Sequence, residues 1–377
     1  MSFWEQARKY DWDETGKTIR FAPAEHVERA LTKERLNQDD LAALLSPAAE
    51  PYLEEMAQRA HRLTQQRFGK VIQLFTPLYL SNLCTNRCAY CGFNADNPVK
   101  RLTLRTEQAA AEGRFLHEQG FRHLLLVSGE APKVVTLPYL EAILVRLRSL
   151  FSSISIELYP MDTRAYRQLI LKGVDGLVVF QETYDQRRYM DVHLGGRKRD
   201  YRWRLETPER GGDAGFRTLG IGALLGLSDW RVEGFFLALH ARYLMKNFWR
   251  SRVNISFPRI RPAVSNYQPP YPVSDLHMVQ LLTALRLFLP DAGFVLSTRE
   301  PPPLRDNLIP LGITSMSAGA RTAPGGYTQG EEAGAQFDIS DHRAPSVVAE
   351  VIKQKGYEPV WKDWDVAFLS GANEAIA

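Results

Sequence analysis

The stretch VIQLFTPLYL (71–80) is the first of eight short apolar segments that alternate with longer amphipathic ones. The other seven are RHLLLVS (122–128), SISIELY (153–159), GLVVFQE (176–182), LGIGALLGL (219–227), RVNISF (252–257), GFVLST (293–298) and ITSMS (313–317). Segments of this length with few polar residues are typical of parallel strands that are buried on both faces. The pattern therefore predicts eight parallel strands.

Apolar residues recur at helical spacing in the stretches between and after these strands. Helices are predicted over 106–119, 137–151, 164–172, 201–214, 230–248, 275–289, 304–311 and 346–355. Eight strand–helix units in about 285 residues indicate a closed (β/α)8 barrel of the TIM type. The same alternation is also compatible with a doubly wound open sheet.

The chain divides into three regions by composition. Residues 1–70 are rich in Glu, Arg, Gln and Ala and predict an N-terminal helical extension. The barrel is expected to span 71–356, and 357–377 to form a C-terminal tail.

The overall composition restricts the possible partners. Of the 377 residues, 45% are hydrophobic and 24% are charged, which is ordinary for a soluble globular protein. No apolar run approaches the ~20 residues of a membrane span, and the N-terminus lacks an apolar signal segment. A net charge of +4 is small for a nucleic-acid-binding protein. We expect a cytoplasmic protein that binds neither membranes nor nucleic acid.

All three cysteines of the chain follow the first strand within eight residues: Cys84-Thr-Asn-Arg-Cys88-Ala-Tyr-Cys91. A [4Fe–4S] cluster is usually held by four cysteine thiolates, so three would leave one iron open to an outside ligand. A zinc ribbon needs a second pair of ligands, and the sequence contains no matching pair. The loop also lies at the end of a strand, where barrel active sites form. We predict a [4Fe–4S] cluster that takes part in chemistry.

The cysteine spacing, with Tyr90 before the third cysteine, resembles the signature of the radical S-adenosylmethionine (SAM) superfamily. The resemblance implies that SAM fills the open iron position and that the reduced cluster splits it to a 5′-deoxyadenosyl radical. It also implies that Tyr90 packs near the adenine of SAM. The tripeptide Ser128-Gly129-Glu130 is similar to the GGE motif that meets the methionine amine, although Ser128 replaces its first glycine.

Three more SAM contacts are implied by the resemblance. Glu182 would accept the ribose hydroxyls, Arg204 would bind the SAM carboxylate through its planar fork, and Gly222 would lie against the adenine. From the residues alone, Arg204 could instead be one more solvent-exposed arginine, and Gly222 a packing glycine. The basic neighbours of Arg204, Lys198 among them, are predicted to lie on a solvent-exposed face.

The segment MSAGARTAPGGY (316–327) follows the eighth strand. Its small residues leave space and expose backbone N–H groups, which favours an anion. We predict that Ser317, Gly319 and Arg321 bind the carboxylate of the substrate, with Arg321 as the charged partner. The alternative is a flexible glycine-rich loop with one exposed arginine.

Residues 71–356 resemble the 2-iminoacetate synthase family, the tyrosine lyases of thiamine thiazole biosynthesis. The resemblance is carried by CTNRCAYCGFN (84–94), VSGE (127–130), IELYPM (156–161), FQETYD (180–185), GIGALLGLSDWR (220–231), ISFPRIRP (255–262) and MSAGARTAPGGY (316–327). It implies cleavage of the Cα–Cβ bond of L-tyrosine to 2-iminoacetate and p-cresol, begun by hydrogen removal from the amino group, while SAM yields 5′-deoxyadenosine and methionine. It also implies a thiazole synthase partner and a flavodoxin- or ferredoxin-type reductant.

Three alternatives differ in substrate or class. A radical SAM synthase could act on another aromatic amino acid or on a deazaflavin precursor. The tyrosine lyase of hydrogenase maturation carries further cysteines near its C-terminus, and this chain has none after Cys91. An iron–sulfur electron carrier would need a fourth protein ligand and a smaller domain.

Overall fold

Eight parallel strands close into a barrel in the computed structural model, which describes residues 2–330, 333–363 and 365. They are β1 (Val71–Ser81), β2 (His123–Ser128), β3 (Ser153–Glu157), β4 (Gly176–Glu182), β5 (Thr218–Ala223), β6 (Arg252–Ser256), β7 (Gly293–Leu296) and β8 (Ser315–Ser317). Each strand pairs in parallel with the next, and β8 pairs with β1 to close the ring. The predicted (β/α)8 barrel is confirmed, and the open-sheet alternative is wrong.

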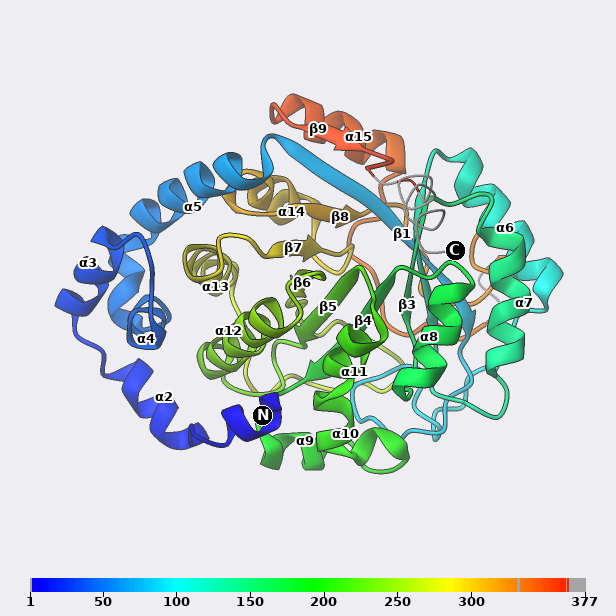
Figure 1. Ribbon diagram of the computed structural model, residues 1–377, viewed down its shortest axis with the longest axis horizontal. Helices are drawn as coiled ribbons and strands as arrows, with labels where there is room; N and C mark the ends of the chain where they lie inside the picture. The colour runs from blue at the N-terminus through cyan, green and yellow to red at the C-terminus, as the bar shows by residue number, and fades with distance from the viewer. Residues whose placement is uncertain (1, 331–332, 364, 366–377) are drawn as a thin grey trace, which may run out of the picture.

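Helices surround the barrel (Figure 1). They are α6 (Thr106–Glu118), α7 (Leu137–Leu147), α8 (Thr163–Leu171), α9 (Gln186–Val192), α12 (Trp230–Asn247), α13 (Asp275–Phe288), α14 (Pro302–Leu308) and α15 (Pro345–Gln354). The single helix predicted over 201–214 is two helices, α10 (Tyr201–Leu205) and α11 (Thr207–Ala214). Pro208 has no N–H to continue the hydrogen-bond ladder, which explains the break.

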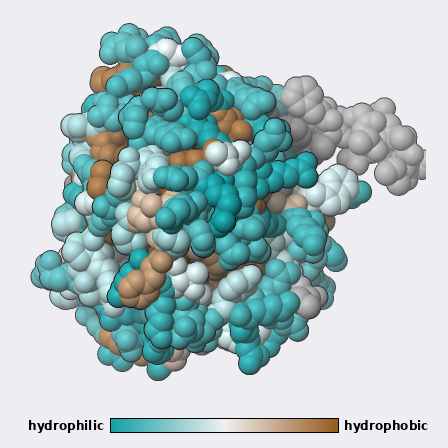
Figure 2. Space-filling view, turned by 90° about the vertical axis from the view of Figure 1, so that its left-hand side faces the viewer, coloured by the Kyte–Doolittle hydropathy of each residue, from teal (hydrophilic) through white to brown (hydrophobic). Residues whose placement is uncertain are grey.

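The region before β1 is helical. It contains α1 (Phe3–Ala7), α2 (Trp12–Arg20), α3 (Ala24–Thr32), α4 (Gln38–Leu44), the 3₁₀ turn η1 (Pro47–Tyr52) and α5 (Leu53–Phe68). These elements lie outside α12 and α13 (Figure 1). The surface on this side of the molecule is mostly hydrophilic, with scattered apolar residues (Figure 2). No helix among the described residues is apolar and long enough to cross a membrane.

The predicted tail begins with one more strand, β9 (Glu358–Val360), which pairs in parallel with the first residues of β1. The tail prediction missed this strand because it is only three residues long and contains Pro359. Residues 364 and 366–377 of the predicted tail lie outside the described residues.

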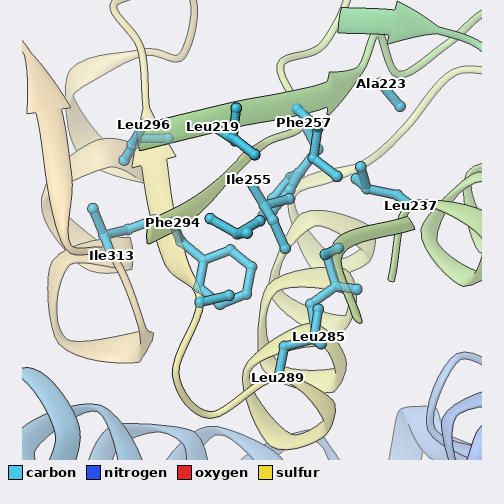
Figure 3. Close-up of a cluster of buried hydrophobic side chains, with 14 of the residues drawn as sticks. Leu219, Ala223, Leu237, Ile255, Phe257, Leu285, Leu289, Phe294, Leu296 and Ile313 are labelled. Atoms are coloured by element: carbon cyan, nitrogen blue, oxygen red, sulfur yellow. The ribbon is translucent and has the colours of Figure 1, made fainter. Parts of the chain in front are cut away.

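The apolar core lies between the strands and the helices. Outward-facing side chains such as Leu219, Ile255 and Phe294 pack there against Leu237 and Leu285 from the helices (Figure 3). Because side chains alternate along a strand, the neighbours of these residues face into the barrel.

The inside of the barrel differs from the outside. TIM-barrel interiors are usually filled by bulky branched residues. Here many inward positions hold small or polar residues, among them Ser155, Gly220, Asn254, Ser256 and Ser315. They surround a cavity of ≈ 170 Å³, which we call the barrel cavity. The fold therefore offers an interior site for a small molecule.

Candidate active site

The cysteine loop leaves the C-terminal end of β1 and is held by a second segment, 192–195. Arg87 N–H donates to Gly195 O (3.0 Å), Ala89 N–H donates to Val192 O (2.9 Å), and Leu194 N–H donates back to Arg87 O (2.8 Å). These bonds fix the backbone between the first and third cysteines. The segment after α9 therefore holds the cysteine loop in place through backbone hydrogen bonds.

The three thiols lie close enough to affect one another. Burial raises the pKa of Cys91 to about 11, and the nearby Cys84 adds to the shift. Burial also raises the pKa of Cys88, and the nearby Cys91 and Cys84 add to that shift. Across the described part of the chain, no group of three or more His, Cys, Asp or Glu side chains is arranged to hold a single metal ion. In an iron–sulfur cluster each thiolate binds its own iron, so three thiols in one loop fit such a cluster.

Tyr90 is anchored by a buried histidine. Its hydroxyl lies 2.9 Å from His193 Nε2, and His193 Nδ1 lies 2.8 Å from Tyr189 O. Since only a protonated Nδ1 can donate to that carbonyl, Nε2 accepts the bond from Tyr90. Burial lowers the pKa of His193 to about 2, so the ring is neutral.

The ring of Tyr90 forms one wall of a second, smaller cavity, which we call the loop pocket. Its other lining residues are Cys91, Glu157, Phe180, Glu182, Lys198, Leu224, Ile260, Arg261, Arg299, Gln336 and Phe337. Phe180, Glu157 and Arg299 also line the barrel cavity, so the two spaces meet there.

Three of the predicted SAM contacts come together from different elements. Arg204 on α10 donates from Nη1 to Glu130 Oε1 (2.9 Å) and from Nε to Phe180 O (2.7 Å). Its Nη2 lies 3.6 Å from Glu182 Oε1, and all three charged side chains are largely buried. Arg204 is therefore not a solvent-exposed arginine.

Lys198 belongs to the same charged group, and its predicted exposure is wrong. Its Nζ donates to Glu182 Oε1 (2.7 Å), and only 12% of its side chain is exposed. The sequence hides this lysine in a run of basic residues, which usually indicates a solvated face. The carboxylate of Glu182 supplies the opposite charge that makes its burial possible.

Glu182 itself has an unusual backbone. Its φ of 72° lies in the left-handed region, which costs a non-glycine residue energy. The pairing register between β4 and β5 also shifts between Phe180 and Glu182. Strain of this kind persists where surrounding contacts hold it, and here Lys198 and Arg204 do so.

The two predicted glycine contacts lie where a neighbouring backbone segment passes close to them. A Cβ on Gly129 would lie 2.3 Å from Leu83 O, and one on Gly222 would lie 2.5 Å from Ser256 O. The backbone of the neighbouring strand or loop thus fills the space that a side chain would need. The hydroxyl of Ser128 donates to Gly129 O (2.9 Å).

The loop after β8 separates the predicted substrate contacts. Ser317 lines the barrel cavity, and its hydroxyl accepts a hydrogen bond from Thr298 N–H (3.1 Å). Gly319 has a φ of 58°, which favours glycine at that turn. Arg321 is exposed, and its side chain lies beside Gly326 rather than in the barrel cavity.

A different arginine lines the cavity. Arg299 follows β7, and its guanidinium lies over the ring of Phe337, 3.3 Å from the centroid. Sequence reasoning missed this residue. Its position directly after a predicted barrel strand, at the rim where ligands bind, was the available signal.

Comparison with known proteins agrees with this architecture. The Radical SAM superfamily model matches residues 78–239, and the Biotin and Thiamin Synthesis associated domain matches 256–358. The FeFe-hydrogenase maturase HydG from Carboxydothermus hydrogenoformans superposes with a TM-score of 0.84, at 34% identity over 96% of this chain and 83% of that one. Methylornithine synthase (PylB) shares the fold, with a TM-score of 0.71, at 20% identity over 89% of this chain and 97% of that one.

Fold and site together define a radical SAM barrel enzyme, which confirms the predicted [4Fe–4S] cluster and SAM as cofactors. Two curated sequences are more similar to this chain than these two structures are, and the similarity extends over nearly their whole length. The chain is 45% identical over 376 residues to a 2-iminoacetate synthase of Escherichia coli (strain K12), covering all of both chains. It is 45% identical over 365 residues to that of Salmonella typhimurium, covering 97% of each. The protein belongs to the 2-iminoacetate synthase family.

Proposed function

We propose that the protein is a radical SAM lyase that cleaves the Cα–Cβ bond of L-tyrosine. The products are 2-iminoacetate and p-cresol, and SAM is split to 5′-deoxyadenosine and methionine. Full-length similarity to two 2-iminoacetate synthases supports this activity. The cluster and SAM, when bound, supply the radical that begins the cleavage, while the protein binds and orients the substrate.

The residues around the loop pocket suit the cofactors. Cys84, Cys88 and Cys91 would hold the cluster. Tyr90 and Glu182 line the pocket beside Cys91, where the adenosine part of SAM would lie. The buried cations Arg204 and Lys198 would compensate the SAM carboxylate, because a buried anion needs a nearby opposite charge.

The substrate proposal depends on one observation, which is that the guanidinium of Arg299 has no anionic partner among the described residues. Its guanidinium lines the barrel cavity but makes no hydrogen bond or ion pair with any described residue. Arg299 is half-buried, so its guanidinium is partly withdrawn from water, and a carboxylate matches its planar fork. We therefore assign the substrate carboxylate to Arg299 rather than to Arg321.

The rest of the barrel cavity fits an aromatic side chain. Phe75, Val178 and Ser256 line the same cavity as Arg299. A tyrosine held there by its carboxylate would have its amino group at the junction with the loop pocket. Such positioning brings the reacting atoms together before the radical forms.

The test uses anaerobically reconstituted protein. Adding SAM should change the EPR spectrum of the reduced cluster, and adding L-tyrosine with dithionite should then yield p-cresol. A spectrum that ignores SAM would favour an electron carrier. Turnover of another aromatic amino acid in place of tyrosine would favour the alternative synthase.

We also propose three features of the cellular setting. A flavodoxin- or ferredoxin-type protein would reduce the cluster. Because 2-iminoacetate hydrolyses readily, a thiazole synthase would take it up directly. The protein would act in the cytoplasm, where thiols stay reduced.

A further inference from the structure

Glu157 lies at the junction of the two cavities and is a second charged side chain that has no ion pair with a described residue. Glu157 ends β3, beside Val127 of β2, and lines both the barrel cavity and the loop pocket. Its carboxylate makes no hydrogen bond or ion pair with any residue that the structure describes. Glu130 and Glu182, by contrast, are both paired with Arg204.

Glu157 and Arg299 are complementary to one kind of ligand. An α-amino acid carries a carboxylate and an ammonium group on the same carbon. If the carboxylate binds Arg299, the ammonium group lies at the junction, where Glu157 is the acid without a partner of its own. Two half-buried and opposite charges at the edge of one cavity are thus explained by a zwitterion that satisfies both.

We infer that Glu157 binds the substrate ammonium group and removes one proton from it. This inference rests on the proposed function. The proton passes from nitrogen to a carboxylate oxygen, so –NH₃⁺ and –COO⁻ become –NH₂ and –COOH, and no electron moves. Loss of a hydrogen atom from the neutral amine leaves an uncharged aminyl radical, whereas loss from the ammonium group would leave a radical cation. Glu157 therefore prepares the amine for loss of a hydrogen atom.

The surroundings of Glu157 suit a base that works near neutral pH. Burial raises the pKa of Glu157 to about 7, and Glu182 on β4 adds to the shift. Arg299, Arg204 and Lys198 act in the opposite direction, and the hydroxyl of Tyr79 on β1 also interacts with Glu157. A carboxylate of this pKa is a stronger base than an ordinary one and is still ionised above neutrality.

Binding tests the inference without turnover. Glu157→Gln keeps the shape of the side chain but cannot be ionised. Calorimetry on the reconstituted, SAM-bound protein would compare L-tyrosine with 3-(4-hydroxyphenyl)propanoate, which lacks the amine. We expect the variant to bind tyrosine about tenfold more weakly and the analogue within about twofold of the wild type. Equal weakening for both ligands, or none for tyrosine, would overturn the inference.

A matched control is Glu107→Gln, an exposed acid on α6 that pairs with Arg146. It should bind both ligands as the wild type does. If Glu157→Gln does not fold, Glu157→Asp keeps the charge and should retain the preference for tyrosine over the analogue. Loss of that preference in a folded Glu157→Asp protein also counts against the inference.

Turnover gives a second readout. The wild-type kcat/KM for p-cresol formation should rise with pH through about 7, since the base form of Glu157 is present above its pKa. Glu157→Gln should lack this rise and form p-cresol about 100-fold more slowly. A variant with wild-type p-cresol formation overturns the role of Glu157 alone. Wild-type protein that makes no p-cresol overturns the proposed function instead.

Discussion

Arg204 on α10 donates a hydrogen bond of 2.9 Å from Nη1 to Oε1 of Glu130, which lies in the loop after β2. The other terminal nitrogen, Nη2, lies 3.6 Å from Glu182 Oε1 at the end of β4. One guanidinium thus connects two acids that are 52 residues apart in the sequence. This arrangement orients the two carboxylates that we assign to the SAM site.

Replacing Arg204 by lysine should weaken SAM binding. Lysine keeps the charge but loses the planar fork that meets two carboxylates and a carbonyl at once. We expect the affinity for SAM, measured by anaerobic equilibrium dialysis, to fall by at least about tenfold. Arg202→Lys is the matched control, because Arg202 is exposed and pairs with Glu206. Equal affinities in the two variants would contradict the assignment.

Replacing Tyr90 by phenylalanine should destabilise the fold. The change leaves the buried Nε2 of His193 without its hydrogen bond, which costs about 1–3 kcal/mol. Because His193 is neutral in the folded protein, the loss should be the same between pH 5 and pH 8. Thermal unfolding would show it, with the half-exposed Tyr271→Phe as control. A loss that changes with pH would mean that His193 titrates in this range.

Glu233 on α12 should make stability depend on pH. It accepts hydrogen bonds from Thr183 Oγ1 and Tyr184 N–H, and burial raises its pKa from 4.5 to about 8. The folded protein therefore favours the protonated acid, and this contribution is lost as pH rises toward 8.

Glu233→Gln mimics the protonated acid and should remove that dependence. We expect the Tm of the wild type to fall relative to the variant between pH 5 and pH 8. Thermal unfolding at three pH values would measure the difference. A difference that stays constant would show that Glu233 is ionised in the folded protein throughout.

Arg299 and Arg321 can be compared directly as partners of the substrate carboxylate. Arg299→Lys should raise the KM for tyrosine by about tenfold, because lysine cannot bind a carboxylate through two parallel hydrogen bonds. Arg321→Lys should raise it less. The sequence-based assignment predicts the opposite order, so steady-state kinetics on the two variants distinguishes them.

The order of strands and helices could be predicted because each barrel strand is a short apolar segment that stands out from the amphipathic stretches around it. Predicted strands such as 71–80 and 176–182 agree with β1 and β4 to within one residue. The helices α1 and α9 were missed, since five or seven residues show too little of a helical period. The bend between α10 and α11 had a visible cause in Pro208.

Only part of the site could be predicted from the sequence. The three cysteines form a local motif, so they could be recognised before the fold was known. Lys198 and Arg299 could not be recognised as site residues from the sequence, because their positions depend on how distant elements pack. Glu157 lies on the inward face with Ser153 and Ser155, and this alternation was visible in SISIELY. The sequence could not show that Glu157 forms no ion pair with any described residue, because that depends on how the strands pack.

The most direct test follows both halves of labelled tyrosine in one reaction. Reconstituted protein would be incubated anaerobically with dithionite, SAM and L-tyrosine that carries distinct isotopes in the ring and at Cα. Borohydride would then trap the imine as glycine for mass spectrometry. We predict ring-labelled p-cresol, Cα-labelled glycine and 5′-deoxyadenosine in equal amounts. Formation of 5′-deoxyadenosine by an intact cluster, with the tyrosine left whole, would contradict the proposed lyase activity.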